Sequence, residues 1–225
     1  MDAINKVVFL LDVDNTLLDN DRMVVDLSHL LTQTLGAESC KLYWQIYEVL
    51  RSETGYADYL GALQRYRLRT THNPDLWKVS SFLLDYPFAD RLYPDTLLVL
   101  QHLRTWGNTV ILSDGDIVFQ PRKIHLSGLW EAVEGRILIY LHKEQMLEDV
   151  QQRYPAQHYV MVDDKLRILS AMKKIMQHRL TTVFPRQGHY AHDPAIIAAY
   201  PPADLSVERI GDLLDVDMGE VLWRH

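Results

Sequence analysis

Bulky apolar residues fill positions 7–11 without a polar interruption, and Asp12 follows them directly. A run this short, closed by a carboxylate, predicts a strand buried on both faces, as in a parallel sheet. Similar runs later in the chain predict further strands: residues 109–112, 136–141, 158–162, 181–184 and 203–207. Apolar residues at helical spacing predict helices between and after them: residues 96–106, 118–126, 143–154, 166–177 and 207–214. Strands that alternate with helices are typical of an α/β domain.

The segment between residues 19 and 89 has a different pattern, because nothing in it alternates like a strand. Apolar residues at helical spacing predict four helices there: residues 24–35, 40–50, 56–68 and 77–84. Gly36 lies where a helix C-cap is expected. The segment is also rich in tyrosine and arginine: Tyr43, Tyr47, Arg51, Tyr56, Tyr59, Arg65, Tyr66, Arg67 and Arg69. We expect most of these to be half-buried or snorkelling side chains on amphipathic helices, and one or two to reach a ligand.

Composition narrows the class of protein. The 225 residues suit one domain, or one core domain with an insertion, and 48% hydrophobic with 24% charged residues is ordinary for a globular protein. A net charge of −7 argues against a general nucleic-acid binder. The single cysteine, Cys40, excludes an internal disulfide and suits a reducing compartment. No run is long enough to span a bilayer and no signal peptide is recognisable, so we expect a cytoplasmic protein that binds neither nucleic acid nor membrane.

Acidic side chains follow two of the predicted strands. Asp12 and Asp14 come after the first strand, and Asp163 and Asp164 come after the strand predicted over residues 158–162. In open α/β sheets ligands bind outside the carboxyl ends of the strands. Two carboxylates this close repel unless a cation or a shared proton lies between them. The pattern therefore indicates a candidate metal-dependent site at this edge of the sheet.

The run Asp12-Val13-Asp14-Asn15-Thr16 resembles motif one, DxDxT, of the haloacid dehalogenase (HAD) superfamily. The resemblance implies that Asp12 is a nucleophile and Asp14 a general acid and base, while Thr16 helps to hold the turn. Many HAD enzymes carry a helical cap inserted after this motif. The resemblance therefore implies an α/β, Rossmann-like core with a doubly wound parallel sheet, formed by residues 1–18 and 90–225, and an α-helical cap domain formed by residues 19–89.

Ser113, Asp114 and Gly115 follow another predicted strand. A hydroxyl and free backbone amides at the carboxyl edge of a sheet can bind a phosphate oxyanion. The run resembles HAD motif two, which implies phosphate binding by these three residues. Lys143 resembles motif three, whose ammonium neutralises the nucleophile and the bound phosphate. Lys123 is a competing candidate, but it falls in the middle of a predicted helix soon after Ser113, so Lys143 is preferred.

Asp163 and Asp164 resemble motif four. The resemblance implies that Mg²⁺ is held by Asp12, by the backbone carbonyl of Asp14 and by the motif-four acids, with oxygen ligands as this ion prefers. Asp164 is the better candidate for direct contact with Mg²⁺. Asp163 would contact the ion through a water molecule or support the residues that bind it. The order of these two remains open.

Taken together, the motifs imply a Mg²⁺-dependent phosphomonoester hydrolase that acts through an aspartyl-phosphate on a small phosphorylated metabolite. Dehalogenases and phosphonatases of the superfamily lack an acid where Asp14 stands, whereas phosphomonoesterases and phosphomutases carry it. A phosphomutase of the same superfamily, or a non-catalytic binding protein that retains the fold, remain the alternatives. The oligomeric state is not readable from the sequence.

Three other hypotheses fit less well. A response-regulator receiver would place its lysine after all its acids, whereas Lys143 precedes Asp163. A P-loop ATPase would need GxxxxGK[ST], which does not occur here. His189 and His192 share a long predicted loop, residues 185–202, and could form a metal pair. Ordinary polar loop residues explain them better, because no third ligand is evident nearby.

Overall fold

The computed structural model describes residues 5–70 and 73–223. Its centre is a six-stranded sheet in which every neighbouring pair of strands is parallel, with the order β3-β2-β1-β4-β5-β6. The strands are β1 Asn5–Leu11, β2 Asn108–Asp114, β3 Ile137–Tyr140, β4 Ala156–Val162, β5 Leu180–Pro185 and β6 Leu205–Val207. The chain changes direction across the sheet between β1 and β4, which is where open parallel sheets bind their ligands. The predicted α/β, doubly wound parallel sheet is confirmed.

Helices cover both faces of the sheet, and the side chains of β1 show why. Val7, Phe9 and Leu11 belong to one buried cluster, whereas Val8 and Leu10 belong to another, as the alternation of a strand requires. The first cluster includes residues of α5 Thr96–Arg104, α6 Phe119–Leu126, α7 Leu129–Ala132, η4 Ile210–Leu214 and α12 Met218–Trp223. The second includes residues of α8 Leu147–Arg153, α9 Leu166–Met176, α10 Gly188–His192 and α11 Pro194–Ala198. Both faces of β1 are therefore buried from solvent, which explains its uninterrupted apolar run.

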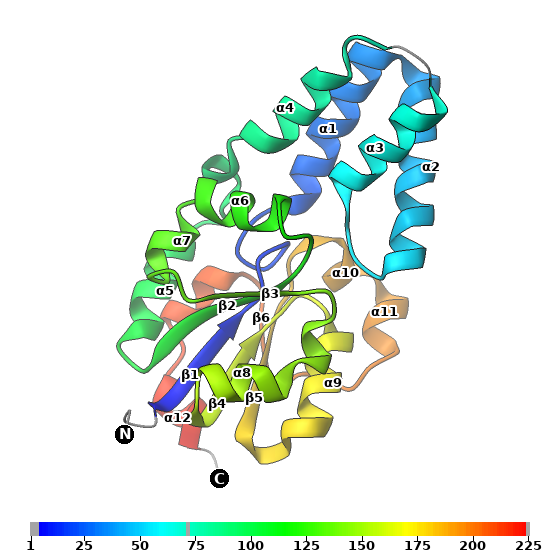
Figure 1. Cartoon of the computed structure of the whole chain (residues 1–225). Coiled ribbons are helices and arrows are strands. Elements are labelled where there is room, and N and C mark those ends of the chain that lie inside the picture. Colours follow the sequence, from blue (N-terminus) through cyan, green and yellow to red (C-terminus); the bar gives the residue numbers. More distant parts are fainter. Residues whose placement is uncertain (1–4, 71–72, 224–225) are drawn as a thin grey trace.

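The described residues between β1 and α5 contribute no strand to the sheet. They form α1 Asn20–Leu35, α2 Ala37–Thr54, α3 Tyr59–Arg69, α4 Leu76–Asp85 and the short η1 Phe88–Arg91. In Figure 1 helices α1–α4 (blue to green) stand together beyond the carboxyl edge of the sheet. We refer to this helical block as the cap and to the rest as the core; the division into residues 19–89 and residues 1–18 with 90–225 stays a prediction.

The two chain crossings between these parts are bonded to each other. Leu18 and Leu92 form an antiparallel bridge. The amide of Asp19 donates to the carbonyl of Arg91 at 2.8 Å, and the amide of Tyr93 donates to the carbonyl of Leu17 at 3.0 Å. The helical block therefore leaves and rejoins the core at one place.

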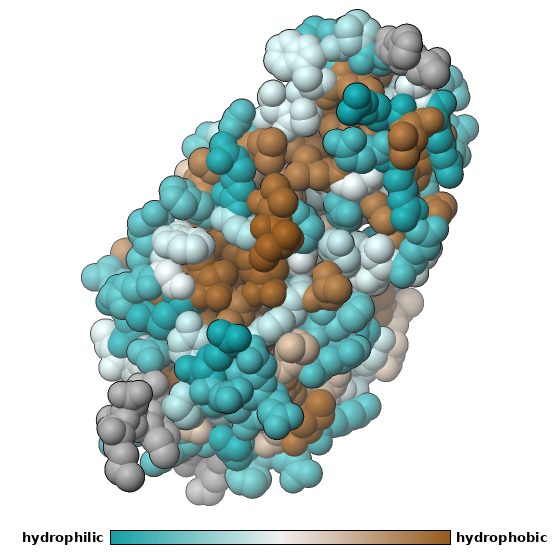
Figure 2. Space-filling view, in the orientation of Figure 1, coloured by the Kyte–Doolittle hydropathy of each residue, from teal (hydrophilic) through white to brown (hydrophobic). Residues whose placement is uncertain are grey.

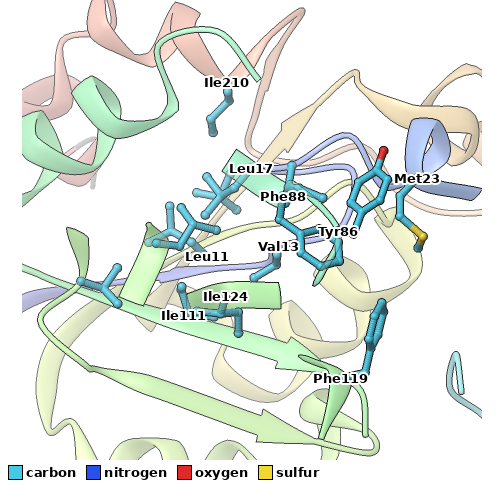
Figure 3. Packing of buried hydrophobic residues seen from close by; sticks show 14 of the residues in the cluster. Leu11, Val13, Leu17, Met23, Tyr86, Phe88, Ile111, Phe119, Ile124 and Ile210 are labelled. Atoms are coloured by element: carbon cyan, nitrogen blue, oxygen red, sulfur yellow. The ribbon is translucent and has the colours of Figure 1, made fainter. Parts of the chain in front are cut away.

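The apolar packing is continuous between the two parts. Figure 3 shows the cluster passing from Leu11 and Ile111 of the sheet to Met23, Tyr86 and Phe88 of the helical block. On the face drawn in Figure 2, hydrophobic residues gather in a band down the middle, with hydrophilic residues on both sides. No helix among the residues the structure describes is long and apolar enough to cross a membrane.

Three predicted elements differ from those observed. The helix expected over residues 143–154 is a 3-10 turn, η2 Lys143–Gln145, followed by α8 from Leu147. At the start of the turn the Lys143 amide donates to the Asp114 carboxylate at 2.7 Å. This contact cannot be predicted from hydrophobic periodicity, because the two residues are far apart in the sequence. The helix expected over 207–214 is the 3-10 segment η4, and the expected loop 185–202 contains α10 and α11. Two residues of the polar segment that ends α3, at positions 71–72, lie outside the described residues.

Candidate active site

Three buried aspartates meet where β1 and β4 end side by side. Leu11 pairs with Val162 in the sheet, so Asp12 emerges next to Asp163 and Asp164. One carboxylate oxygen from each lies within 4.8 Å of the others. All three side chains are almost fully buried. The structure thus brings together the predicted nucleophile and the predicted motif-four acids.

Thr16 ties the two strand ends together. Its hydroxyl donates to Asp12 Oδ2 at 3.3 Å and accepts from the Asp164 amide at 3.0 Å. The turn is possible because Asn15 adopts a left-handed conformation with φ 62°, which asparagine tolerates better than most residues. The Asn15 carboxamide oxygen accepts from the amides of Asn20 and Asp21, both at 3.1 Å. Motif one is therefore held rigidly against both the second acid pair and the start of α1.

Lys143 lies between two of the three acids. Its ammonium forms an ion pair with Asp12, lies 2.7 Å from Asp163 Oδ2 and donates to the Leu112 carbonyl at 3.2 Å. Burial opposes its charge, but the carboxylates outweigh burial and raise the pKa of Lys143. Burial likewise raises the pKa of Asp12, but Lys143 and Lys165 outweigh it, so the pKa of Asp12 is lowered. The two lysines therefore favour the charged carboxylate form of Asp12.

Asp164 is the acid that this arrangement leaves uncompensated. Both of its carboxylate oxygens are buried and have no hydrogen-bond partner among the described residues. Burial raises its pKa well above the ordinary value, with Lys165 only partly opposing. A buried carboxylate without a partner is costly unless a cation binds it. The residues present therefore fit a hard divalent cation that takes oxygen ligands from Asp164 and Asp12.

Asp163 is in a different position from its neighbour. Oδ1 of Asp163 accepts from the Lys165 amide at 2.8 Å, and Oδ2 faces Lys143. Burial raises the pKa of Asp163 to about 6, with Lys143 as the main opposing charge. Asp163 therefore has protein partners for its charge, and Asp164 has the oxygens left for a cation.

The predicted phosphate-binding residues lie beside this cluster, at the end of β2. Ser113 is buried, and its hydroxyl accepts from Gln120 Nε2 at 2.9 Å. The Asp114 carboxylate holds the Lys143 amide, and burial raises its pKa. The Gly115 amide donates to the Tyr140 carbonyl at 3.0 Å, so it is already engaged rather than free for a phosphate oxygen as we had expected. The Ser113 hydroxyl lies 3.5 Å from the Asp114 carbonyl, and the Lys143 ammonium is the donor that contacts Asp12 and Asp163.

Asp14 turns away from the acid cluster toward α6. Its Oδ1 accepts from Lys123 Nζ at 2.5 Å, and its Oδ2 lies 3.4 Å from Gln120 Nε2. Lys123 is fully buried, whereas the Asp14 side chain is 22% exposed. Lys143 thus lies between Asp12 and Asp163, and Lys123, the competing candidate, also contacts a predicted site residue through Asp14. Sequence analysis missed this role, because a lysine in the middle of a helix is usually solvated. The signal that the sequence offers is the spacing of three residues between Gln120 and Lys123, which places both side chains on one face of the helix.

The helical block contributes side chains above the site. Asn20 donates to the Tyr59 hydroxyl at 3.2 Å. Arg51 donates to the Tyr190 hydroxyl of α10, and Lys165 lies 5.5 Å from the centre of the Tyr190 ring. The Tyr59 ring also packs edge-on against Phe119 of α6, at 5.4 Å between ring centres, so both Tyr59 and Arg51 contact residues of the core.

The remaining candidates are placed away from the chemistry. Tyr43 and Tyr66 are buried within the helical block, and Arg65 forms an ion pair with Glu53 at 2.6 Å. His189 Nδ1 lies 2.7 Å from Asp21 Oδ1. Among the described residues, the group that could hold a metal ion consists of Asp12, Asp163 and Asp164, and no histidine belongs to it.

A parallel α/β sheet with paired aspartates at the ends of two adjacent strands, and a lysine between them, is typical of hydrolases that use a carboxylate nucleophile. A family model described as haloacid dehalogenase-like hydrolase matches residues 7–175, so the chain belongs to this family of hydrolases. No curated protein matched the sequence.

Solved structures agree with this assignment. The chain is 62% identical to a haloacid dehalogenase-like hydrolase from Burkholderia xenovorans LB400, over 95% of this chain and 97% of that one, with a TM-score of 0.91. It shares the fold of L-2-haloacid dehalogenase from Xanthobacter autotrophicus, at 18% identity, 94% and 98% coverage and a TM-score of 0.61. It also shares the fold of the magnesium-bound HAD-hydrolase YfnB from Bacillus subtilis, at 14% identity, 93% and 97% coverage and a TM-score of 0.61.

Proposed function

We propose that this hydrolase is a Mg²⁺-dependent phosphatase that cleaves small phosphomonoesters through an aspartyl-phosphate on Asp12. The observation that carries the proposal is the carboxylate of Asp14. It stands two residues after the nucleophile, is partly open to the site and is held by hydrogen bonds. A dehalogenase of this family has no acid at this position, whereas cleavage of a phosphomonoester needs one to protonate the leaving oxygen.

The first half of the reaction uses Asp12 and Asp14, each of which is paired with a lysine. Asp12 attacks phosphorus with a carboxylate oxygen, and the bond to the leaving oxygen breaks as the new bond forms. Asp14 gives a proton to that oxygen, so the alcohol departs uncharged. Lys143 and the Ser113 hydroxyl stabilise the equatorial phosphate oxygens, where charge accumulates in the transition state.

In the second half, Asp14 takes a proton from water, and the water attacks the phosphorus bound to Asp12. The phosphate is released and Asp12 is regenerated as a carboxylate. When bound to Asp12 and Asp164, Mg²⁺ would offset the repulsion between the anionic nucleophile and the anionic ester. The orphaned oxygens of Asp164 are what support this cofactor.

The test is release of inorganic phosphate from p-nitrophenyl phosphate and from a panel of sugar phosphates and nucleotides, with Mg²⁺ and with excess EDTA. We expect turnover that requires Mg²⁺. Asp12→Asn should abolish it, and Asp14→Asn should reduce it about a hundred- to ten-thousand-fold, the usual range for general acid–base catalysis. Glu131→Gln on α7, an exposed acid remote from the site, is the matched control and should keep full activity.

Trapping with beryllofluoride, followed by peptide mapping, should place the adduct on Asp12. Label on Asp163 or Asp164 would overturn the nucleophile assignment. Full activity of Asp14→Asn, or release of halide from a 2-haloalkanoate without any phosphatase activity, would overturn the proposed function itself.

A further inference from the structure

Lys123 contacts Asp14, but the proposed reaction gives it no role. It is on α6, and its side chain has no solvent exposure. Its ammonium donates to Asp14 Oδ1 at 2.5 Å and to Asn20 Oδ1 at 2.9 Å. The rings of Phe119 and Phe88 lie 5.1 and 5.8 Å from it. Burying an ammonium among apolar side chains costs free energy. A specific role for Lys123 would explain why the lysine is kept at this position.

Helix α6 holds both oxygens of Asp14, but unequally. Lys123 grips Oδ1 through a short charged contact, whereas Gln120, one turn earlier, reaches Oδ2 at 3.4 Å and bonds Ser113 better, at 2.9 Å. Charge-assisted hydrogen bonds are roughly twice as strong as neutral ones. Oδ1 is therefore the anchored oxygen of Asp14, and Oδ2 is the one that can exchange its weak contact for a substrate oxygen.

The anchor also extends into the cap. Asn20, the first residue of α1, donates through its amide nitrogen to the Tyr59 hydroxyl of α3 at 3.2 Å. The Tyr59 ring contacts Phe119 of the core at 5.4 Å and stacks on Tyr47 of the cap at 5.0 Å. Lys123 thus touches the acid on one side and, through one asparagine, a cap tyrosine on the other.

We propose that Lys123 is a positioning residue of the phosphatase reaction. It holds Oδ1 of Asp14, so that Oδ2 exchanges the proton with the leaving oxygen. Asn20 in turn holds the Lys123 ammonium, and it does so only while the Tyr59 ring of the cap packs on the core. The inference rests on the proposed function, because it assigns the working oxygen of the proposed acid. If Lys123 only stabilised the fold, its removal would lower the activity equally for every substrate. A positioning role instead predicts a larger loss for substrates whose leaving group needs a proton.

The experiment compares kcat/KM for two esters. p-Nitrophenyl phosphate releases a stabilised phenolate that needs little protonation, whereas an alkyl phosphate such as glycerol phosphate releases an alkoxide that needs a proton as the bond breaks. Lys123→Met keeps the length of the side chain without its charge. We expect it to lower kcat/KM on the order of ten- to a hundred-fold for the alkyl ester, part of the full acid–base effect, and only a few-fold for the aryl ester.

Tyr59→Phe removes only the far hydroxyl of the anchor. We expect a loss of roughly five-fold for the alkyl ester, the size of one neutral hydrogen bond, and little for the aryl ester. Combined with Lys123→Met it should add nothing, since both changes break one network. Tyr43→Phe is the matched control: its hydroxyl donates to the Tyr59 carbonyl at 2.9 Å in the same aromatic group, without contact to Lys123, and it should keep the wild-type ratio between the esters.

Equal losses for both esters, or a wild-type ratio in Lys123→Met and Tyr59→Phe, would overturn the inference while the activity of the wild type still supports the proposed function. If Lys123→Met does not fold, the ratio in Tyr59→Phe alone decides. A wild type without phosphatase activity would overturn the proposed function first, and the positioning role of Lys123 with it.

Discussion

Gly55, at the C-terminus of α2, lies directly against the imidazole of His142 in the loop after β3. A Cβ built on Gly55 would stand 2.4 Å from His142 Cε1, and the residue has φ +83°. This contact joins the cap to the core. It adds to the contacts of Tyr59 with Phe119 and of Arg51 with Tyr190, which also link the cap to the core.

Gly55→Ala should therefore loosen the cap as well as strain the backbone. Gly128→Ala is its matched control, because Gly128 shares the left-handed conformation of Gly55 (φ 80° and 83°, ψ 0° in both) but has nothing within 4 Å of the added atom. Both substitutions should cost about 1 kcal/mol for a left-handed residue with a Cβ, seen as a lower midpoint of thermal unfolding. Only Gly55→Ala should also raise KM. Equal KM values for the two variants would show that His142 and Gly55 do not support the cap.

Removing Lys143 should destabilise the fold more than removing any surface lysine. Lys143→Met leaves Asp12 and Asp163 buried without their shared cation, and breaking a buried pair typically costs about 3–5 kcal/mol. Lys173→Met, which breaks a half-exposed pair with Asp204, should cost about 1 kcal/mol or less. Urea unfolding without metal measures both. A loss in Lys143→Met no larger than in Lys173→Met would contradict the buried-pair geometry.

Mg²⁺ should stabilise the wild type through Asp164. A ligand that binds only the folded state adds about 2.7 kcal/mol when it is present at a hundred times its dissociation constant. Asp164→Asn removes a carboxylate whose oxygens have no other partner among the described residues, so it should lose most of the rise in melting temperature caused by Mg²⁺. Asp215→Asn, at an exposed position, should keep it. An unchanged rise in Asp164→Asn would remove Asp164 from the metal site.

Asp204 should make stability depend on pH in the acid range. Its carboxylate accepts from Lys173 Nζ, the Thr182 amide and the Thr182 hydroxyl. Burial raises the pKa of Asp204, but these donors outweigh burial, so the folded-state pKa is lowered from 3.8. The stability it contributes is complete above pH 4 or so and is lost as the pH falls through the lower folded pKa.

Asp204→Asn should consequently unfold more easily than the wild type at pH 7, by about 1 kcal/mol, and the difference should shrink at pH 3 and below. Asp90→Asn, an exposed aspartate of η1, is the control and should show no pH-dependent difference. Denaturant unfolding at several pH values checks this. A constant difference across the range would show that the folded-state pKa of Asp204 is not lowered.

The sequence predicted the acid cluster because strand ends are visible in hydrophobic periodicity. Asp12, Ser113 and Asp163 each follow a short apolar run, and the ends of parallel strands meet at one edge. Lys123 could not be recognised in this way, since its burial depends on Phe88 and Phe119 from different parts of the chain. The break before α8 was missed for a similar reason: the Asp114 carboxylate that holds the Lys143 amide is far away in sequence.

The paired crossings at Leu18 and Leu92 have a consequence for how such a protein can change over time. Because both ends of the helical block are bonded to each other, the chain passes between the two parts at one place, while side chains pack across the boundary elsewhere. Segments whose ends lie close together can be exchanged or resized with little effect on the scaffold that carries them. We therefore expect that the helical block can be exchanged for another one, changing the substrate range, provided that the new block keeps the apolar contacts with the core.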